Sequence, residues 1–454
     1  MKSLIGDKKF YRMVLIVCIP IVIQNGFTNL ASLLDNIMIG QLGTLSMSGV
    51  SISNQLFQVF NVSVFGAMSG AGIFLAQFYG RGNRDGVHNC FRIKMLLGIL
   101  ISILAICIFK VLGPSLISLY LNDDPTDSLT TLNFGKQYMD VMLIGLIPFA
   151  ITQVYSSSLR ETGNTVLPMK ASVIAVIVNF CINYILIFGN FGFPRLGVIG
   201  AAIGTVISRV VNLIIVAGMG AVLIKAKQSP ERIASRKIFA QIVKIGFPSA
   251  LETALYNIAM TFIVRFMNQM DVDGMNVTAR SYAMQIANFS YCVGAALAQA
   301  NAIMTGWRIG AKKYEECDRG TRKAVIYGLV TATCFSVTFA ITGRFIVHIF
   351  TNDIQMIELV VKLLVVDIFL EFGRVTNLVY GQALKTSGDA IFPVIMGAIF
   401  MYLFAVGGTY FLGIHMGLLA VGAYIAMAGD ECARAVGMVL RWKSGKWKSK
   451  SLVE

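Results

Sequence analysis

The sequence is poor in charged residues. Of its 454 residues, 13% are charged, against about 25% in soluble globular domains. Hydrophobic residues make up 56%, and the mean hydropathy is +0.72. This shortage of charge argues against a soluble domain, and apolar runs of about 20 residues, the length of a membrane-spanning helix, recur from end to end. The alternating pattern of a membrane β-barrel is missing. The sequence therefore predicts an all-α polytopic membrane protein.

Metal-binding, disulfide and enzyme signatures are missing as well. The three histidines are far apart, and the eight cysteines show no CxxC and no paired spacing, so neither a metal centre nor a disulfide framework is expected. No HExxH sequence and no nucleophile elbow is present. We expect no enzyme activity and no cofactor.

Positive charge is concentrated in the loops. A net charge of +15 would suit nucleic acid in a soluble protein, but Lys and Arg fall mainly in alternate loops, as the positive-inside rule expects of cytoplasmic loops. The basic loops around Arg81 and Lys312 share a side with both termini, whereas most of the opposite loops are short and neutral or acidic. We expect a multi-pass protein of the cell membrane with both termini in the cytoplasm and no nucleic-acid partner.

Twelve membrane spans can be drawn, an even number that two cytoplasmic termini require. They start near Met13, Gly49, Arg92, Gly135, Val166, Gly197, Phe239, Thr278, Lys323, Met356, Ile391 and Gly417.

The two halves of the chain repeat one another. The pattern L-[KR]-x-x-G-x4-P occurs at 159–168 and again at 384–393, where Gly suits the turn after a helix and Pro the start of the next. We predict a first lobe over 1–224, a cytoplasmic connector over 225–238, a second lobe over 239–442 and a basic tail over 443–454. Two pseudo-symmetric six-helix lobes would enclose a central cavity, an arrangement typical of alternating-access carriers.

The first span carries one acid, Asp35. An acid in a bilayer is costly, so it should face a partner or a hydrated cavity. Asn179 and Asn183 share a helical face on the fifth span, and Thr205 follows the small-residue run GAAIG on the sixth. These four residues are candidates for binding a proton or small cation; the alternative is that they hydrogen-bond between helices for packing. The candidates for a substrate cavity on the first span are Gln24, Asn25 and Asn29.

The second half carries more charge. Glu252 follows Pro248 by one turn, and Glu371, Arg374 and Asn377 recur at three-residue steps. Glu252, Glu371 and Arg374 are candidates for ion coupling, with Na⁺ possible at Asp35 or Glu252; alternatively Glu371 and Arg374 form a structural pair. The candidates for the substrate cavity in this half are Tyr256, Asn257 and Asn377.

Other charged residues are expected near the membrane surfaces. We interpret Asp367, Asp430 and Glu431 as interfacial, and Arg160, Lys385 and the tail RWKSGKWKSK as cytoplasmic anchors that face lipid.

The ordered set of motifs resembles the multidrug and toxic compound extrusion (MATE) family. The set comprises IP-x3-Q-x10-D-x2-MIGQLG, AQFYGRGN, N-x3-NY-x-LIFG, the repeated L-[KR]-x-x-G-x4-P turn and FLEFGRVTNLVYGQALKTSGD, which is similar to one bacterial branch. The resemblance covers nearly the whole chain. It implies a twelve-span exporter of cationic, often aromatic compounds in exchange for H⁺ or Na⁺.

The resemblance also assigns roles by position. Asp35 matches a first-span aspartate tied to ion coupling, and Asn179 and Asn183 match a polar pair whose second member is an aspartate in the best-known proton-coupled branch. Tyr256 and Arg374 stand where a sodium-coupled branch has acids. These departures leave the coupling ion open between H⁺ and Na⁺.

Export of organic cations by antiport is therefore the leading hypothesis. The alternative is a flippase of a lipid-linked precursor, which would need a basic cavity, whereas the sequence suggests one deep arginine, Arg374, against three deep acids. We expect a monomer whose partners are small organic cations and membrane lipids.

Overall fold

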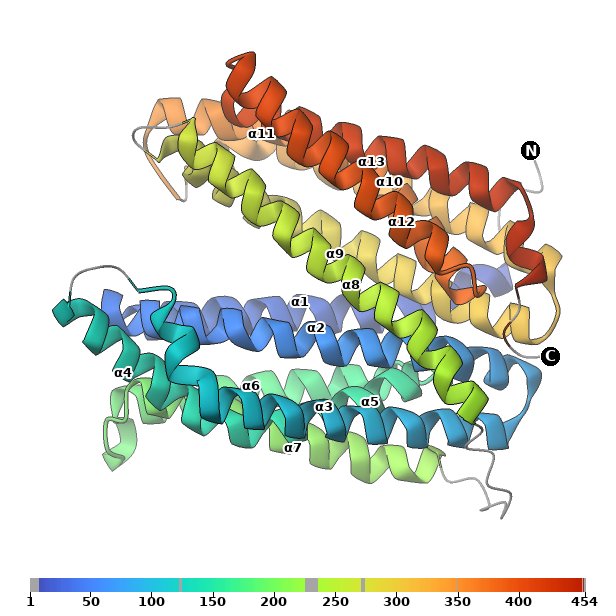
Figure 1. Ribbon diagram of the computed structural model, residues 1–454, viewed down its shortest axis with the longest axis horizontal. Helices are drawn as coiled ribbons and strands as arrows, with labels where there is room; N and C mark the ends of the chain where they lie inside the picture. The colour runs from blue at the N-terminus through green and yellow to red at the C-terminus, as the bar shows by residue number, and fades with distance from the viewer. Residues whose placement is uncertain are drawn as a thin grey trace. The chain divides into compact units, whose positions relative to one another are not determined.

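The structure is a computed structural model, and it describes residues 8–121, 125–224, 236–270, 274–348, 350–450 and 452. Within these residues the chain is helical and contains no strand. Twelve helical rods follow one another in the described part of the chain, which confirms the predicted all-α architecture and number of spans (Figure 1). The predicted connector over 225–238 lies mostly outside the described residues.

Ten of the rods are single α-helices: α1 (Lys8–Gly40), α2 (Thr44–Arg81), α3 (Arg84–Ser118), α6 (Val166–Phe188), α7 (Val198–Ile224), α8 (Arg236–Gln269), α9 (Met275–Gly310), α10 (Tyr314–Val347), α11 (Ile354–Thr386) and α13 (Leu419–Lys443).

Two rods are interrupted. The fourth consists of α4 (Pro125–Met142), the 3₁₀ turn η1 (Leu143–Gly145) and α5 (Leu146–Glu161). The eleventh consists of α12 (Ile391–Phe400) and the π-helical segments η3 (Met401–Val406) and η4 (Thr409–His415). Breaks of this kind inside a helix often mark functional sites. The short 3₁₀ segments η2 (Asn190–Gly192) and η5 (Lys446–Ser449) lie in a connection and in the tail.

The rods differ in how apolar they are. In the described part of the chain, nine are long and apolar enough to cross a membrane by length and composition. The three that fall short are α9, α11 and α13, which pack against one another: α11 contacts both α9 and α13. Their polar residues are accommodated because these helices bury much of their surface in protein rather than exposing it to lipid.

The chain forms two compact units. Unit 1 comprises 1–22, 76–82 and 251–454, and unit 2 comprises 23–75 and 83–250. The division inside α1 falls two residues after Pro20, and the division inside α8 falls two residues after Pro248. Proline interrupts the hydrogen-bond ladder of a helix and favours a bend, so each of these helices changes unit where its backbone is weakest. The start of α1, up to Val22, therefore belongs to unit 1, and the start of α8, up to Ala250, belongs to unit 2. The predicted lobes divide the chain differently, and their bounds stay a prediction.

The repeated L-[KR]-x-x-G-x4-P pattern forms the same turn in each unit. Gly163 follows α5 with φ +92°, and Gly388 follows α11 with φ +97°. Side chains other than glycine are strained at such angles. The prolines of the pattern, Pro168 and Pro393, lie in the first turn of α6 and of α12, as the sequence predicts.

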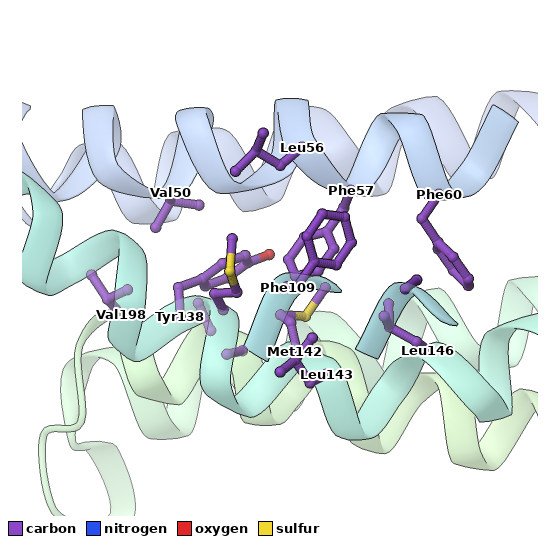
Figure 2. Packing of buried hydrophobic residues seen from close by; sticks show 14 of the residues in the cluster. Val50, Leu56, Phe57, Phe60, Phe109, Tyr138, Met142, Leu143, Leu146 and Val198 are labelled. Carbon is purple, nitrogen blue, oxygen red and sulfur yellow. The ribbon is translucent and has the colours of Figure 1, made fainter. Parts of the chain in front are cut away.

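The core of unit 2 is a continuous apolar cluster between α2, α3, α4, α5 and α7 (Figure 2). Phe57 and Phe109 meet edge to face, with ring centroids 5.4 Å apart. Met142 and Leu143 of the interrupted fourth rod lie in the same cluster. Unit 1 has several smaller clusters: one includes Ile263 and Leu363, and another includes Val379 and the stacked rings of Trp442 and Trp447.

Candidate functional site

A polar cavity of about 590 Å³ lies in unit 2 between α1, α2, α4, α5, α6 and α7. Its walls carry one carboxylate, Asp35, and one guanidinium, Arg209. The other polar groups are neutral amides and hydroxyls; the amide side chains are those of Gln24, Asn36, Asn54, Gln58, Asn61, Gln153, Asn179 and Asn212. The cavity is therefore hydrophilic, with few charges.

The predicted polar residues around Asp35 form a connected chain. The Asn183 amide donates to Asp35 Oδ1 at 2.7 Å, and it also approaches the Asn179 Oδ1 atom at 3.4 Å. The Asn179 amide in turn lies 3.5 Å from the hydroxyl of Thr205. A Cβ atom at Gly204 would overlap Asn183, so the small residue of the GAAIG run is what lets this amide approach α7.

Asp35 has no basic partner among the described residues. It is half-buried, lines the cavity and receives one hydrogen bond, from Asn183. A carboxylate in this position can bind a proton, a metal cation or an organic cation without first breaking an ion pair.

Gln24 joins the cavity to Ser172 and Arg160. Its amide donates to Ser172 at 2.9 Å, and its oxygen accepts from Arg160 at 3.4 Å. Next to Arg160 in sequence, Glu161 pairs with the fully buried Lys94 at 2.5 Å. Arg160, expected to face lipid, therefore contacts a cavity residue instead.

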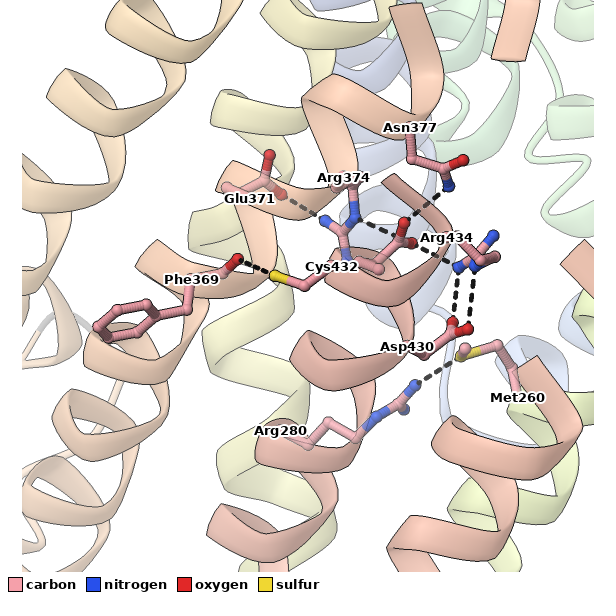
Figure 3. Close-up of polar contacts among 10 residues, drawn as sticks. Met260, Arg280, Phe369, Glu371, Arg374, Asn377, Asp430, Cys432 and Arg434 are labelled. Atoms are coloured by element: carbon pink, nitrogen blue, oxygen red, sulfur yellow. Dashed lines mark hydrogen bonds and ion pairs between the residues drawn. The ribbon is translucent and has the colours of Figure 1, made fainter. Parts of the chain in front are cut away.

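Unit 1 contains a different polar site, a dense cluster of ion pairs between α11 and α13 (Figure 3). Arg374 pairs with Glu371 one turn earlier on α11, and its Nε atom lies 3.8 Å from Glu431 on α13. Arg434 holds Asp430 with two hydrogen bonds, of 2.9 and 2.6 Å, and lies 2.9 Å from Glu431. Glu431 therefore bridges two arginines.

The cluster borders a smaller cavity of about 260 Å³. Arg374, Glu431 and Arg434 line it, and the Asn377 amide donates to Glu431 at 2.9 Å. Glu252 also lines this cavity, where it pairs with Lys385 at 2.5 Å. Each of the three bases that line this cavity thus contacts a carboxylate, in contrast to Arg209.

The comparisons with known proteins agree with one another. The sequence profile of the MatE family matches residues 20–185 and 248–411, well over half of the chain. The chain belongs to the MATE family of transporters. The two matched segments begin at Pro20 and Pro248, so they coincide with the two repeats in the sequence.

Similar proteins extend over almost the same length as this MATE transporter. An uncharacterized transporter, YisQ, of Bacillus subtilis is 28% identical over 92% of this chain and 91% of its own. A probable multidrug resistance protein, NorM, of Thermotoga maritima is 26% identical over 96% of this chain and 92% of its own.

Solved structures share the fold. An outward-facing multidrug resistance MATE family transporter of the MOP superfamily superposes with a TM-score of 0.88 at 20% identity, covering 99% of this chain and 98% of that one. A MOP superfamily transporter from Pyrococcus furiosus, described as having a binding pocket of reverse polarity, superposes with a TM-score of 0.85 at 20% identity, covering 98% of each chain.

The structure places only part of the predicted substrate residues of this MATE transporter at these two cavities. Gln24 lines the unit 2 cavity; Tyr256 and Asn377 line the unit 1 cavity. Asn25, Asn29 and Asn257 line neither, and the Asn257 amide bonds to its own helix at Thr253.

Several predictions for charged residues are wrong. Lys385 was expected to face lipid, but it lines the cavity of unit 1 and pairs with Glu252. The tail was expected to anchor in lipid, but Trp442 and Trp447 are buried against unit 1. Asp367, Asp430 and Glu431 are buried inside the protein, and their expected position near the membrane surface stays a prediction.

The expectation of one deep arginine is also wrong. Arg209 lines the unit 2 cavity, and Lys94, Arg280 and Arg434 are buried in the described part of the chain. A polar stripe on α7, formed by Thr205, Ser208, Arg209 and Asn212, could have revealed Arg209, because spacings of three and four put residues on one helical face. A similar stripe on α2 comprises Ser51, Asn54, Gln58 and Asn61.

Proposed function

We propose that this MATE transporter is a secondary active antiporter that exports organic cations in exchange for H⁺ or Na⁺. The observation that supports this most directly is Asp35, a carboxylate in a cavity of about 590 Å³ with one amide donor and no basic partner among the described residues. The probable multidrug resistance relatives support the same class of substrate.

Exchange at Asp35 follows from competition for one charge. An ionised Asp35 attracts an organic cation, and a proton or Na⁺ on the same carboxylate removes that attraction. A ligand shifts a conformational equilibrium only by the difference in its affinity for the two states, so coupling requires Asp35 to bind each cation differently in the two access states. Alternating access of the two lobes then converts competition into antiport.

Both coupling ions suit the chemistry around Asp35. A proton needs only the carboxylate, whereas Na⁺, like other hard cations, prefers several oxygen ligands. Asn179 and Thr205 supply an amide oxygen and a hydroxyl within the same hydrogen-bonded chain.

We propose a conditional role for the acids of unit 1. Glu252 and Glu371 each have a basic partner, Lys385 and Arg374. They can exchange a proton or cation only when that partner moves away or takes another ligand. This makes Glu252 and Glu371 sensors of conformation rather than open binding groups.

We further propose that the protein works as a monomer in the cell membrane with both termini in the cytoplasm. Single cysteines in a cysteine-free background test the orientation. An impermeant thiol reagent outside the cell should label a cysteine at Leu42, between α1 and α2, and should not label one at Asn83, between α2 and α3. The opposite labelling would invert the proposed topology.

The decisive test of function is efflux from liposomes. Purified protein is reconstituted with a fluorescent organic cation inside, and an inward pH gradient or an inward Na⁺ gradient is imposed. Efflux driven by one gradient identifies the coupling ion and supports antiport. Absence of efflux under both gradients, together with transbilayer movement of a lipid-linked pyrophosphate, would overturn the proposal in favour of the flippase.

A further inference from the structure

The unit 2 cavity holds two charged side chains of opposite sign that do not pair with each other. Asp35 is held by the neutral amide of Asn183. Arg209 donates from Nη1 to the backbone carbonyl of Gly145 at 3.3 Å, and its Cζ atom lies 4.9 Å from the centre of the Phe149 ring. Neither charge has an ion-pair partner among the described residues.

Most of the hydrogen-bonding capacity of Arg209 is unused. A guanidinium has five N–H groups, and the described residues accept one hydrogen bond from it. A cation partly removed from water is costly without a compensating anion. The 3₁₀ turn η1 ends at Gly145, so the break in the fourth rod supplies the carbonyl that holds Arg209 beside the cavity. The site is therefore prepared for an anion that the described part of the protein does not supply.

The walls of the cavity are suited to an organic framework. Tyr138 lines the same cavity as Asp35 and Arg209. Its hydroxyl donates to Asn54 at 3.3 Å, and Phe57 and Phe149 provide aromatic surface on the same walls.

The cavity walls near Arg209 also carry amide side chains. Asn212 follows Arg209 by three residues on α7 and so lies on nearly the same face, and Asn61 lines the same cavity. Amides can donate hydrogen bonds to a polar ligand or accept them from it.

We propose that the unit 2 cavity binds a zwitterionic organic molecule, with its ammonium group at Asp35 and its carboxylate at Arg209. This inference rests on the proposed function, because it takes Asp35 as the exchange site, and it narrows the substrate from organic cations to amines that also carry an acid. The volume of about 590 Å³ suits a small organic ligand of this kind.

In this arrangement Asp35 and Arg209 have different roles. An ionised Asp35 and Arg209 together match both ends of a zwitterion, whereas a plain cation leaves Arg209 unmatched and repelled. When a proton or Na⁺ occupies Asp35, the ammonium group loses its partner but the carboxylate keeps its own. Asp35 therefore responds to the coupling ion, and Arg209 selects the class of substrate.

The test compares three forms of one fluorescent scaffold: an amino-carboxylate, its methyl ester and its N-acetyl derivative. The first is a zwitterion, the second a cation and the third an anion. Equilibrium binding to the purified full-length protein in nanodiscs is measured for the wild type, Asp35→Asn, Arg209→Gln and Arg209→Lys. Arg195→Gln serves as the matched control, because it removes the same charge from an exposed loop of the same unit.

We expect the wild type to bind the zwitterion more tightly than either derivative. Arg209→Gln should weaken zwitterion binding by roughly tenfold to a hundredfold, the usual worth of a hydrogen bond to a charged group, and leave the methyl ester unchanged or tighter. Arg209→Lys should recover part of the loss, and Arg195→Gln should change nothing.

Two results would overturn the inference: equal affinity of the wild type for zwitterion and ester, or equal loss of both ligands in Arg209→Gln. The second result would assign Arg209 a structural role. Gradient-driven efflux of the ester without efflux of the zwitterion would likewise reject the inference while leaving the proposed function intact. Failure of the proposed function differs, because then neither gradient would drive efflux of any of the three forms.

Discussion

The two cavities of this MATE transporter carry their charged side chains in opposite ways. Unit 2 places one acid and one base in a cavity lined mainly by neutral amides, and it leaves both charges without ion-pair partners among the described residues. Unit 1 packs acids and bases side by side, so that Arg374, Arg434 and Lys385 each contact a carboxylate.

This difference suggests that the unit 2 cavity binds a ligand and that the ion pairs of unit 1 stabilise the structure. A paired buried charge is held in place, and removal of its partner costs several kcal/mol, whereas an unpaired charge beside a cavity is available to a ligand. The two units share the glycine turn of the internal repeat, with φ near +90° in both, but not the arrangement of charges. The repeat thus preserves the helical framework, and the chemistry has diverged on it.

Asp35→Asn should have the largest effect on transport, because it removes the one carboxylate of the unit 2 cavity. The amide keeps the shape of the carboxylate but cannot bind a proton or attract a cation, so gradient-driven efflux should fall to background while the protein stays folded. Asp140→Asn is the matched control, because Asp140 forms an exposed ion pair with Lys110 in the same unit. Undiminished efflux by Asp35→Asn in liposomes would remove Asp35 from the mechanism.

Arg374→Gln should have the largest effect on stability. It leaves Glu371 buried beside a neutral group, a change that typically costs about 3–5 kcal/mol, whereas Glu431 keeps Arg434. The apparent Tm in detergent, followed by circular dichroism, should fall clearly. Lys110→Gln, which breaks an exposed ion pair, should cost about 0–1 kcal/mol. Similar losses from both variants would mean that the unit 1 cluster does not stabilise the fold.

Asn183→Ala should weaken the unit 2 site without abolishing it. It removes the one hydrogen bond that Asp35 receives from the described residues. A hydrogen bond to a charged group contributes about 1.5–3 kcal/mol and favours the ionised carboxylate, so in the variant a proton should compete more strongly for Asp35 and cation binding should weaken by up to roughly tenfold. Binding is measured by titration of a fluorescent organic cation into the purified protein. The control is Asn190→Ala, which removes an exposed amide bonded to the Tyr184 carbonyl; equal effects of both would deny Asn183 a specific role.

Glu252→Gln should alter how transport depends on the coupling ion. The change leaves Lys385 without its carboxylate and should shift the pH or Na⁺ dependence of efflux severalfold rather than abolish transport. The exchange Glu252→Lys with Lys385→Glu restores a pair and should restore much of the wild-type profile. An unchanged pH or Na⁺ dependence of efflux in Glu252→Gln would mean that the Glu252–Lys385 pair has only a structural role.

The tail should give the smallest effect, which depends on pH. Burial opposes ionisation of Asp389, but hydrogen bonds from Arg441 and Lys450 outweigh it, so the pKa of Asp389 lies below its ordinary value. Because the folded pKa is the lower one, the stabilisation is complete above the ordinary carboxyl range and is lost as pH falls through the folded pKa.

Tryptophan fluorescence reports this loss, because Trp442 and Trp447 are buried and stacked 4.2 Å apart. Acidification below about pH 4 should produce a small red shift in the wild type. In Asp389→Asn the shift should already be present near neutral pH, whereas Glu358→Gln, an exposed acid of the same unit, should behave like the wild type. A pH response that survives in Asp389→Asn would assign the titration to another group.

The sequence alone was enough for the number of helices, the internal repeat and the polar chain around Asp35. Each of these rests on a local rule: apolar run length gives the spans, glycine and proline give the repeated turn, and four-residue spacing aligns Asn179 with Asn183. Such rules need no knowledge of neighbouring helices.

Only the tertiary structure decided which charges are buried and which ones pair across helices. Asp430 and Glu431 are buried with Arg434 and Arg374 because α13 packs against α11, and Lys385 meets Glu252 across 133 positions of sequence. Arg209 is left without a carboxylate for the same reason: the helices packed around it present amides, hydroxyls and rings. The free energy of a buried charge depends on what surrounds it in three dimensions, and a position in the sequence does not specify those surroundings.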